Sequence, residues 1–352
     1  MEIRQLKKKI EFYLEGFFQE KEKEKEFRES EVFKEAVKKI KEITLTGGKR
    51  IRPIIFFLSF SAFSSKKKEE ALKTSIFLEL IHSYLLIHDD IIDNDTLRRN
   101  KPTTWYSYEQ YLKKMGLKKN QEKMAKDLAI IAGDLACSWA YQILSQSKFA
   151  EELKIKGLAK LNEMLAKVIE GQFLDILLPL KKKIKKSQIL RAYLLKTASY
   201  TFQYPFQIGA ILAGLSPQKA EEFSSFALPL GIAFQIQDDI LGLWAKEKEI
   251  GKPLATDLRE GKRTLLWHFA SQKIKERDKN FLQTLIGKKR LRKEEIERAR
   301  EIFSSSLALA KSKKLSQQLI NQSEEKILSL KIKKEAKKNL IDLVNFLKKR
   351  NV

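Results

Sequence analysis

The sequence predicts an all-α protein, and three observations lead to that expectation. Apolar residues recur with a period close to 3.6 along nearly the whole chain, whereas runs of alternating β-branched residues are almost absent. The 7 prolines fall mostly near apparent helix ends or turns. The 352 residues are 43% hydrophobic, which is enough for a sizeable core, and no Gly/Ser/Pro-rich linker divides them. We therefore expect residues 1–352 to form a single all-α domain.

The expected helices follow one another along the chain. Residues 1–46 have the pattern of one or two charged amphipathic helices, Gly47 and Gly48 interrupt it, and a helix begins near Pro53. Further helices are expected at 69–97, 123–146, 154–178, 187–214 and 217–246, with loop and short helix at 99–122, a basic connection at 181–186 and a polar loop at 247–262. Another helix begins at Arg263. We interpret residues 271–352, which are lysine-rich and helical, as packing scaffold.

The net charge of +25 favours an anionic partner, such as a phosphorylated substrate, a nucleic acid or an acidic lipid surface. Most lysines are mixed with glutamates, as in residues 20–26 and 333–338, which is typical of exposed helix faces. The sequence carries no zinc or RNA-binding signature, so we expect no nucleic-acid partner.

The single cysteine, Cys137, excludes an internal disulfide and favours a reducing compartment. Its apolar neighbours indicate a buried structural thiol. The chain starts without an apolar signal segment, and no long uninterrupted apolar run is present. We therefore expect a cytoplasmic protein with no membrane span.

Residues 82–93 are the most informative stretch of the chain. On an ideal helix the polar side chains of this region gather within about a third of the wheel. They are Glu79, His82, Ser83, Asp89, Asp90 and Asp93. The rest of the wheel is apolar or aromatic apart from His88. Carboxylates this close repel one another unless a cation lies between them, and Mg²⁺ takes one or two carboxylates and completes its shell with waters and substrate phosphate.

A second acidic face lies far downstream, after the apolar run of residues 228–234. Gln235, Asp238, Asp239 and Gly242 share one face of the predicted helix. Two acidic clusters on two apolar helices predict a cavity with metal sites on opposing walls.

Basic groups accompany these carboxylates. A glycine turn at Gly47 and Gly48 opens onto Lys49, Arg50 and Arg52, where exposed N–H groups and a helix N-terminus attract phosphate. Arg98 and Arg99 follow the first acidic helix by one turn, and they could form structural ion pairs or clamp a diphosphate. Isolated cations lie further along the chain at Lys196, Lys252 and Lys262.

Together these residues give the chain its resemblance to the trans-isoprenyl diphosphate synthases, also called polyprenyl synthetases. The matching pieces occur in the family's order and span roughly residues 40–270. They are residues 48–53, 88–99, 133–134, 171–175, 196–197, 234–242 and 251–264. The resemblance implies the isoprenoid synthase fold, an antiparallel helical bundle around a deep central cavity, usually as a homodimer, with up to three Mg²⁺ ions in each active site.

The resemblance also implies roles for individual residues. The metal ligands would be Asp89, Asp90, Asp93 and Asp238, with Asp239 as a water-mediated partner. The allylic diphosphate would be held by Arg98, Lys196 and Lys262, with Lys252 nearby. The diphosphate of isopentenyl diphosphate would be held by Lys49, Arg52, His82 and Arg99. Thr197 and Gln235 would flank the allylic cation, and Gln172 and Asp175 also match active-site positions. Many members carry a third aspartate in the second motif where this chain has Gly242.

The implied reaction is head-to-tail condensation of isopentenyl diphosphate with dimethylallyl, geranyl or farnesyl diphosphate. Metals and fixed cations in a dry cavity stabilise the departing diphosphate better than water does. In this family an aromatic residue five positions before the first aspartate shortens the product. That position is occupied by Tyr84, followed by Leu85, and this pair resembles the corresponding residues of archaeal-type geranylgeranyl diphosphate synthases. We therefore expect geranylgeranyl diphosphate as the product, with farnesyl diphosphate as the alternative. Tyr84 could instead be a core aromatic, because an ideal helical wheel points Leu85 more directly toward the aspartates.

Two alternatives share some of these features. A class I terpene cyclase has the same first motif, but it normally carries Ser/Thr and Glu where this chain has Gly242 and Lys246. A non-catalytic family member tends to lose its aspartates, and this chain keeps the first motif whole.

Overall fold

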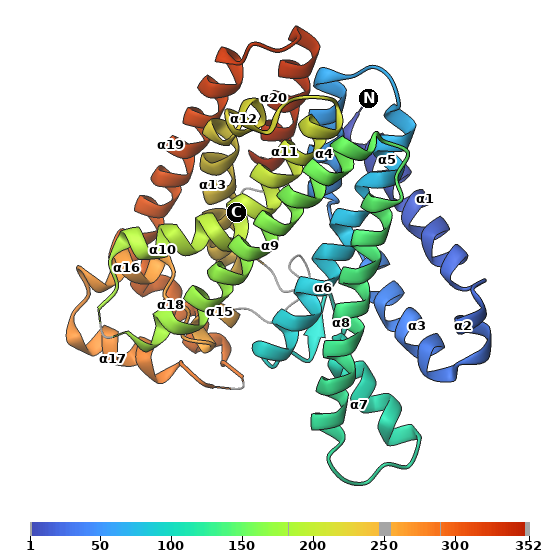
Figure 1. The fold of residues 1–352 in the computed structure, drawn as a ribbon. Coiled ribbons are helices and arrows are strands. Elements are labelled where there is room, and N and C mark those ends of the chain that lie inside the picture. Colours follow the sequence, from blue (N-terminus) through green and yellow to red (C-terminus); the bar gives the residue numbers. More distant parts are fainter. Residues whose placement is uncertain (1, 182, 246–254, 289, 349–352) are drawn as a thin grey trace. The chain divides into compact units, whose positions relative to one another are not determined.

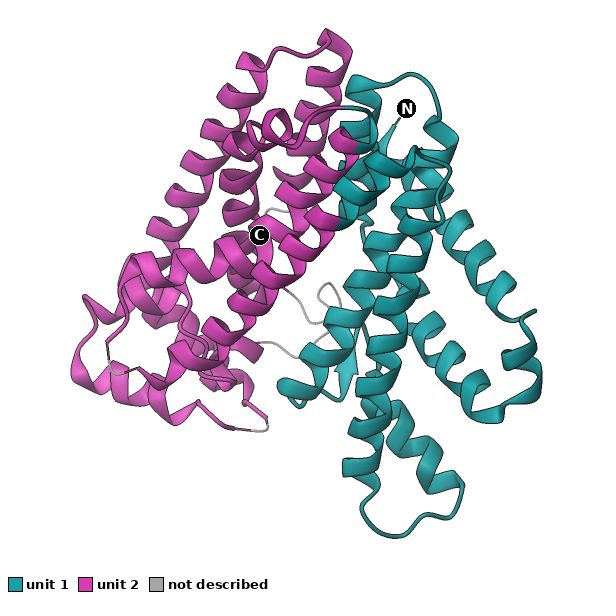
Figure 2. Ribbon diagram, in the orientation of Figure 1, with its two compact units in different colours: residues 1–158, 212–214 teal, residues 159–211, 215–352 magenta. Residues whose placement is uncertain are grey.

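The computed structural model describes residues 2–181, 183–245, 255–288 and 290–348, and helices dominate these residues (Figure 1). The chain divides into two compact units (Figure 2). Unit 1 comprises Met1–Leu158 and Leu212–Gly214, and unit 2 comprises Ala159–Ile211 and Leu215–Val352. The all-α prediction is confirmed, whereas a single domain over 1–352 stays a prediction.

Unit 1 is built on eight helices and the start of a ninth. They are α1 (Ile3–Lys21), α2 (Lys25–Glu29), α3 (Glu31–Leu45), α4 (Ile51–Phe63), α5 (Lys68–Ser75), α6 (Phe77–Ile92), α7 (Thr104–Lys114), α8 (Gln121–Ser145) and α9 (Glu151–Leu177). Residues 1–46 thus form three helices, not one or two. The helix predicted at 69–97 is interrupted at Ile76 and ends at Ile92.

The core of unit 1 surrounds α4 and α6. Phe56, Phe60 and Phe77 are almost completely buried, and so is Phe18 of α1. Helix α8 buries a face of small residues, which are Ala125, Ala129, Ala132, Gly133, Ala136 and Ala140. Small side chains allow close helix packing, and α8 packs on both α6 and α7.

A short hairpin that sequence periodicity did not predict follows α6. Strand β1 (Leu97–Arg98) pairs antiparallel with β2 (Lys101–Pro102), with Arg98 opposite Lys101. The two turn residues have positive φ, 53° at Arg99 and 60° at Asn100. Positive φ at both central residues is the geometry of a type I′ turn, so this turn fixes the direction of the two predicted diphosphate-binding arginines.

Unit 2 contains the rest of α9 and the elements that follow it. They are η1 (Leu178–Leu180), α10 (Lys186–Tyr193), η2 (Leu194–Gln203), α11 (Tyr204–Leu212, whose last residue belongs to unit 1), α12 (Pro217–Glu221), α13 (Ser224–Trp244), α15 (Thr256–Arg259), α16 (Leu265–Ser271), α17 (Glu276–Thr284), α18 (Lys293–Ser305), α19 (Ala308–Ser329) and α20 (Lys334–Lys348). The helix predicted at 217–246 is therefore two helices, and the first is capped by the hydroxyl of Ser216, which accepts from the N–H of Lys219.

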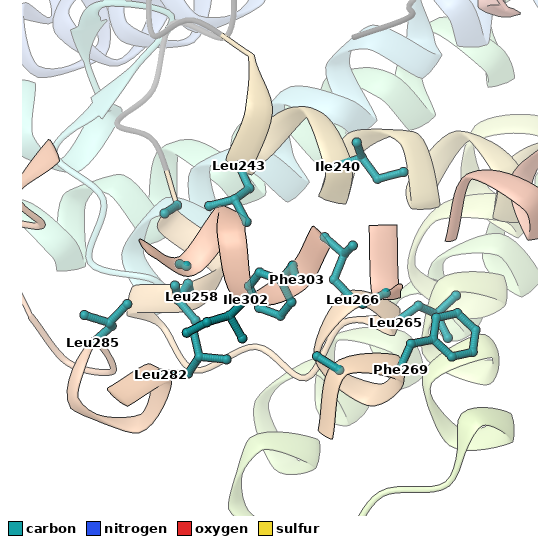
Figure 3. Close-up of a cluster of buried hydrophobic side chains, with 14 of the residues drawn as sticks. Ile240, Leu243, Leu258, Leu265, Leu266, Phe269, Leu282, Leu285, Ile302 and Phe303 are labelled. Atoms are coloured by element: carbon teal, nitrogen blue, oxygen red, sulfur yellow. The ribbon is translucent and has the colours of Figure 1, made fainter. Parts of the chain in front are cut away.

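A cluster of buried apolar side chains holds the end of α13 against the short helices that follow it. Figure 3 shows Ile240 and Leu243 of α13 near Leu258, Leu266 and Phe303. Leu258 belongs to α15, so its burial anchors the one-turn helix that also carries Asp257. The N–H of Ala255 donates to the carbonyl of Gly242 over 2.9 Å and ties the two elements together.

Segment η2 is wider than an α-helix and has π-helical hydrogen bonding. Pro205 follows it and has no N–H to donate to the preceding turn. Two glycines on neighbouring helices admit its backbone: a Cβ at Gly171 would lie 2.5 Å from the nitrogen of Lys196, and a Cβ at Gly231 would lie 2.4 Å from the Cα of Ala198. Wide turns of this kind often occur at functional sites, and this one carries Lys196 and Thr197.

Among the described residues, α8 alone has the length and apolar composition to cross a membrane. Its most apolar window has a mean hydropathy of 1.3, and 39% of that window is buried in the protein. Core helices of soluble proteins meet the same criterion, so α8 gives only weak support for a membrane span.

Candidate active site

The first aspartate motif lies at the end of α6, where the hairpin arginine Arg98 contacts it. Asp90 is completely buried, Arg98 donates to its Oδ1 from Nε over 2.7 Å, and Nη2 of Arg98 lies 2.5 Å from the same oxygen as an ion-pair contact. Nη2 is also 3.7 Å from Oδ2 of Asp89. Burial lowers the pKa of Arg98, but the charge and hydrogen bond of Asp90 outweigh it and raise the pKa above its ordinary value. Asp89 and Asp93, which lie one turn apart, are partly exposed.

A buried ion pair supports the glycine turn before α4. Nη1 of Arg50 is 2.6 Å from Oε2 of Glu79, and the two side chains are only 2% and 4% exposed. The same nitrogen donates to the carbonyl of Thr44 over 2.8 Å. Sequence reasoning placed Glu79 on the polar face and Arg50 in the basic motif, but it assigned neither a site role. Their pairing accounts for the conformation of this turn.

Arg99 reaches back to the same turn. Its Nη1 donates to the carbonyl of Thr46, and a Cβ at Gly48 would lie 3.4 Å from Nη2 of Arg99. Burial, followed by the charge of Arg50, lowers the pKa of the Arg99 guanidinium. The structure thus brings the glycine turn and the hairpin together, as a shared phosphate site requires.

His82 lies on α6 within this cluster of cations. Burial, followed by the charges of Arg52 and Arg99, lowers the pKa of His82 well below its ordinary value. The imidazole is therefore neutral near pH 7 and can still donate one N–H. Lys49 is exposed and Arg52 is partly buried. Four of the residues predicted to hold the isopentenyl diphosphate therefore come from one region of unit 1.

In unit 2, Lys196 of η2 is held by Asp175 of α9. Lys196 Nζ donates to Oδ2 of Asp175 over 2.6 Å, and Lys262 Nζ lies 3.8 Å from the same oxygen and 2.8 Å from Glu260. Thr197 Oγ1 donates to Oε1 of Gln235 over 2.6 Å. The structure therefore brings together five of the residues that the sequence predicts on this side of the site, which are Asp175, Lys196, Thr197, Gln235 and Lys262.

The second motif presents its two aspartates differently. Asp239 is buried, accepts from the hydroxyl of Tyr193, and accepts from Nε2 of Gln235 over 2.8 Å. Burial, followed by the charge of Asp257, raises the pKa of Asp239 well above its ordinary value. Asp238 is partly exposed. The roles of Asp238 as a direct ligand and of Asp239 as a supporting group stay predictions.

The ion pair of Lys196 with Asp175, the Thr197–Gln235 hydrogen bond and Asp239 border a cavity of about 90 Å³ in unit 2. Its polar lining consists of Asp175, Tyr193, Lys196, Thr197, Gln235, Asp239, Asp257, Lys262, Arg263 and Thr264. Sequence reasoning missed Tyr193 as a site residue, and it quoted Asp257 only as part of a matching segment. The predicted site residue Lys252 lies outside the described residues. Gln172 is in α9 beside Gly171.

The donor chemistry fits Mg²⁺, since the predicted ligands are all carboxylates. In the part of the chain that the structure describes, no three acidic, histidine or cysteine side chains form a ready metal cage. Mg²⁺ does not need one, because it commonly binds one or two carboxylates together with waters and substrate phosphates. Asp89, Asp93 and Asp238 have the exposure that such an open site requires.

The predicted chain-length residue Tyr84 packs against His88 of its own helix, and His88 contacts α8. Its ring lies edge-on to that of His88 at a centroid distance of 4.7 Å, and Nε2 of His88 is 3.2 Å from the carbonyl of Ile130. A Cβ at Gly133 would lie only 2.6 Å from Nε2 of His88, so this glycine admits the imidazole. Leu85 is partly exposed on the same helix.

Comparisons with known proteins agree with this arrangement. The family model described as polyprenyl synthetase matches residues 33–303. A geranylgeranyl diphosphate synthase of Sulfolobus acidocaldarius is 36% identical over 73% of each chain, and a short chain isoprenyl diphosphate synthase of Methanocaldococcus jannaschii is 34% identical over 77% of each. A crystal structure of geranylgeranyl pyrophosphate synthase from Corynebacterium glutamicum, complexed with isoprenyl diphosphate and magnesium, superposes with a TM-score of 0.93 at 28% identity and 100% coverage of both chains.

An all-α scaffold of this kind, with aspartates and fixed cations on its helices, defines an isoprenoid synthase. The chain belongs to the polyprenyl synthetase family and is a prenyltransferase.

Proposed function

We propose that this enzyme condenses isopentenyl diphosphate with an allylic diphosphate and releases geranylgeranyl diphosphate as its main product. The relatives from S. acidocaldarius, Saccharolobus solfataricus and Methanosarcina mazei, at 36%, 31% and 32% identity, are all geranylgeranyl diphosphate synthases. A relative from Aeropyrum pernix at 32% identity is a geranylfarnesyl diphosphate synthase. The product of this chain therefore needs its own support, and the aromatic Tyr84 supplies it.

The proposed chemistry begins when the allylic carbon–oxygen bond of the first substrate breaks and its diphosphate group departs. Lys196 and Lys262, with Arg98, would bind its oxygens and stabilise the charge that develops on them. The carboxylates of Asp89, Asp90, Asp93 and Asp238 would hold up to three Mg²⁺ ions, which supply further neutralisation of the leaving group. Thr197 and Gln235, joined by a 2.6 Å hydrogen bond, would turn oxygen atoms toward the allylic cation.

The second substrate would bind through Lys49, Arg52, His82 and Arg99. The observation that supports this assignment is the cluster itself: Arg99 contacts the glycine turn, and the charges of Arg52 and Arg99 act on a partly buried His82. A cluster of basic side chains of this kind is what a diphosphate requires for binding.

We also propose a homodimer. On α9 within unit 2, Ile169, Phe173, Ile176 and Leu177 are 43–61% exposed, and their spacing puts them on one helical face. On α8 in unit 1, Ile131 is 64% exposed. Exposed apolar faces of this kind are typical of subunit interfaces.

Light scattering on the wild type and on Ile131→Glu measures the oligomeric state. The wild type should be a dimer, and a monomeric wild type would refute the proposal.

One assay tests the proposed function. The purified chain is incubated with Mg²⁺, isopentenyl diphosphate and, separately, dimethylallyl, geranyl or farnesyl diphosphate, and product chain length is measured. We expect products that end at twenty carbons and activity that is lost with EDTA and restored by Mg²⁺. Products ending at fifteen carbons would establish farnesyl diphosphate synthesis instead, and cyclic hydrocarbons would establish a terpene cyclase.

The chain-length role of Tyr84 has a separate test. Tyr84→Ala removes the ring that packs on His88, so we expect a shift from twenty carbons toward longer products with the overall rate largely kept. An unchanged product length would show that Tyr84 is a core aromatic and that another residue sets the limit.

A further inference from the structure

The turn that joins α19 to α20 carries a concentration of lysines that the candidate active site does not use. Residues 326–338, here called the basic turn, contain six lysines and a single glutamate. They comprise the end of α19, a short connection and the start of α20. Figure 1 shows this turn at the end of unit 2 opposite α17 and α18. The motifs that carry the family resemblance end at residue 264, so prenyl transfer leaves these charges unexplained.

The exposed lysines of the basic turn have no carboxylate partners. Elsewhere in unit 2 an exposed lysine can pair with a glutamate on its own helix, as Lys279 does with Glu276 over 3.4 Å. Within the described part of the chain, neither Glu335 nor any exposed lysine of the basic turn forms such an ion pair. Lys337, which is partly exposed, donates to the carbonyl of Leu328 over 2.6 Å. The glutamate that the sequence places among residues 333–338 therefore neutralises none of its neighbours through direct contact.

This arrangement of charges is unfavourable for the free protein. Lys334 is the first residue of α20 and Lys333 precedes it, so both cations lie at the positive end of the helix dipole. Lys338 follows Lys334 at a spacing of four residues, where like charges repel. A negative surface close to the basic turn would offset both effects. The turn therefore fits an anionic partner better than it fits water alone.

Apolar side chains lie among these lysines. Leu328 is 61% exposed, and the partly exposed Leu330 and Ile332 alternate along the chain with Lys331 and Lys333. An anionic bilayer matches this combination, because its headgroups attract lysines and its acyl chains accept apolar side chains. A single-stranded nucleic acid would instead stack its bases on aromatic side chains or arginines, and residues 326–338 contain neither.

We propose that the basic turn is a docking surface that attaches this protein reversibly to bilayers containing anionic phospholipids. The lysines would contact the headgroups, and Leu328 would enter the boundary between headgroups and acyl chains. Clusters of about four to eight cations are typical of proteins that bind anionic lipids in this way. Attachment at the interface needs no membrane-spanning helix. The proposal goes beyond the proposed function and does not depend on it.

Sedimentation with sucrose-loaded vesicles measures this attachment without catalytic turnover. The vesicles consist of phosphatidylcholine alone or of an equal mixture of phosphatidylcholine and phosphatidylglycerol. We expect the full chain to bind the mixed vesicles and not the neutral ones. Binding should weaken as sodium chloride is added, because salt screens exposed charges. Equal binding to both kinds of vesicle, or binding to neither, would overturn the proposal.

A fourfold variant removes the exposed charges of the basic turn and its connection. It carries Lys331→Gln, Lys333→Gln, Lys334→Gln and Lys338→Gln. Each lysine near an anionic surface strengthens binding by roughly 5-fold, so we expect the partition coefficient to fall by about 100-fold or more. Prenyl transfer without vesicles should match that of the wild type, which would show that the variant is folded.

A control variant removes the same net charge from exposed positions of unit 2 outside the basic turn. It carries Lys273→Gln, Lys275→Gln, Lys293→Gln and Lys313→Gln. This variant should keep most of the wild-type affinity for the mixed vesicles. An equal loss in both variants would show that the net charge of the chain, and not the basic turn, governs binding, and it would overturn the proposal.

Leu328→Ser tests the apolar contribution separately, because it changes no charge. We expect binding to the mixed vesicles to weaken by roughly 5-fold to 10-fold, as for partial loss of leucine burial. The dependence on salt should stay as it is in the wild type. Unchanged binding in this variant would contradict insertion of Leu328 into the bilayer.

Proteolysis of the wild type locates the contact. Trypsin cleavage after Lys331 and Lys333, followed by mass spectrometry, should be slowed by the mixed vesicles and not by the neutral ones. Cleavage after Lys273 and Lys275 should proceed equally in all conditions. Unchanged cleavage at the basic turn while the vesicles bind would place the contact elsewhere and overturn the proposal. Binding of single-stranded RNA at the same salt concentration, without binding of vesicles, would also overturn it.

Discussion

Lys196 and Asp175 form an ion pair in which Nζ lies 2.6 Å from Oδ2. The two residues come from different helices, and the pair exists because Gly171, one turn before Asp175, lets the backbone of η2 approach α9. The carboxylate thus holds the ammonium at the edge of the cavity before any substrate arrives. A cation fixed in advance stabilises a developing charge without reorganisation.

Removing the cation should be more harmful than removing its partner. Lys196→Gln should lower the rate of prenyl transfer by about 100-fold, corresponding to roughly 3 kcal/mol for one fixed donor. Asp175→Asn keeps the cation but loosens it, so we expect a smaller loss of about 10-fold. Glu170→Gln is the control, because Glu170 lies on the same helix as Asp175 and forms an exposed ion pair with Arg191 of α10. Steady-state kinetics on the three variants measures this, and equal rates in Lys196→Gln and the control would refute the role of Lys196.

Gly171→Ala tests the close approach of η2. The new Cβ would meet the backbone of Lys196 at 2.5 Å and 2.8 Å, so the helices must separate. We expect a loss of about 1–3 kcal/mol in unfolding free energy, as for other overpacked sites, together with a fall in prenyl transfer. Gly16→Ala on α1 has no atom within 4 Å and should stabilise the chain by up to about 1 kcal/mol. Similar denaturant midpoints for both variants would show that no tight contact exists at Gly171.

The buried pair of Arg50 and Glu79 predicts a non-additive effect on stability. Glu79→Leu removes the nearer and more buried of the two carboxylates around the Arg50 guanidinium and leaves only Glu11, 3.6 Å from Nε, so the loss should approach the roughly 3–5 kcal/mol typical of a broken buried pair. The double change Arg50→Met with Glu79→Leu removes both charges and should cost clearly less. Glu152→Ala, which breaks the exposed pair with Lys156, should change stability little. Urea unfolding measures all three, and additive losses in the double variant would contradict a buried ion pair.

Cys137 predicts a pH dependence with a definite sign. Burial, followed by the charge of Asp134, raises the pKa of the thiol from 9.0 to about 11. Only the thiolate reacts with alkylating reagents, so its fraction near pH 8 should be about 100-fold below that of a thiol at 9.0. Iodoacetamide labelling of the native chain should keep accelerating between pH 9 and about 11. A plateau near pH 9, as for the urea-unfolded chain, would show that the thiol is not perturbed.

The sequence was sufficient for the fold class, because apolar periodicity reports helices directly. It did not reveal the break at Ile76 or the one at Glu222 and Phe223 within 217–246, since no glycine or proline marks either position. The hairpin at Leu97–Pro102 was missed because its strands are two residues long and have no alternating pattern.

In the candidate site, too, the sequence predicted which residues belong to motifs but not the contacts that depend on tertiary packing. Motif spacing and the family resemblance selected Asp90, Arg98, Lys196 and Gln235 as candidate site residues, but they did not predict the contacts of Lys196 with Asp175 and of Gln235 with Asp239. Tyr193 could not be predicted as the partner of Asp239, because the contact joins residues 46 positions apart and depends on the packing of α10. Asp257 lies near Gly242 only because α15 folds back onto α13.

We propose that Asp89 and Asp93 of the first motif and Asp238 of the second bind, through divalent ions, the diphosphate of one allylic substrate. The most direct test is a crystal structure of the full chain with Mn²⁺ and farnesyl thiolodiphosphate, a slowly reacting analogue, with the ions located by anomalous scattering. We predict ions at both motifs with a single diphosphate bridging them. Ions at one motif alone, or at two motifs that share no diphosphate, would contradict the account.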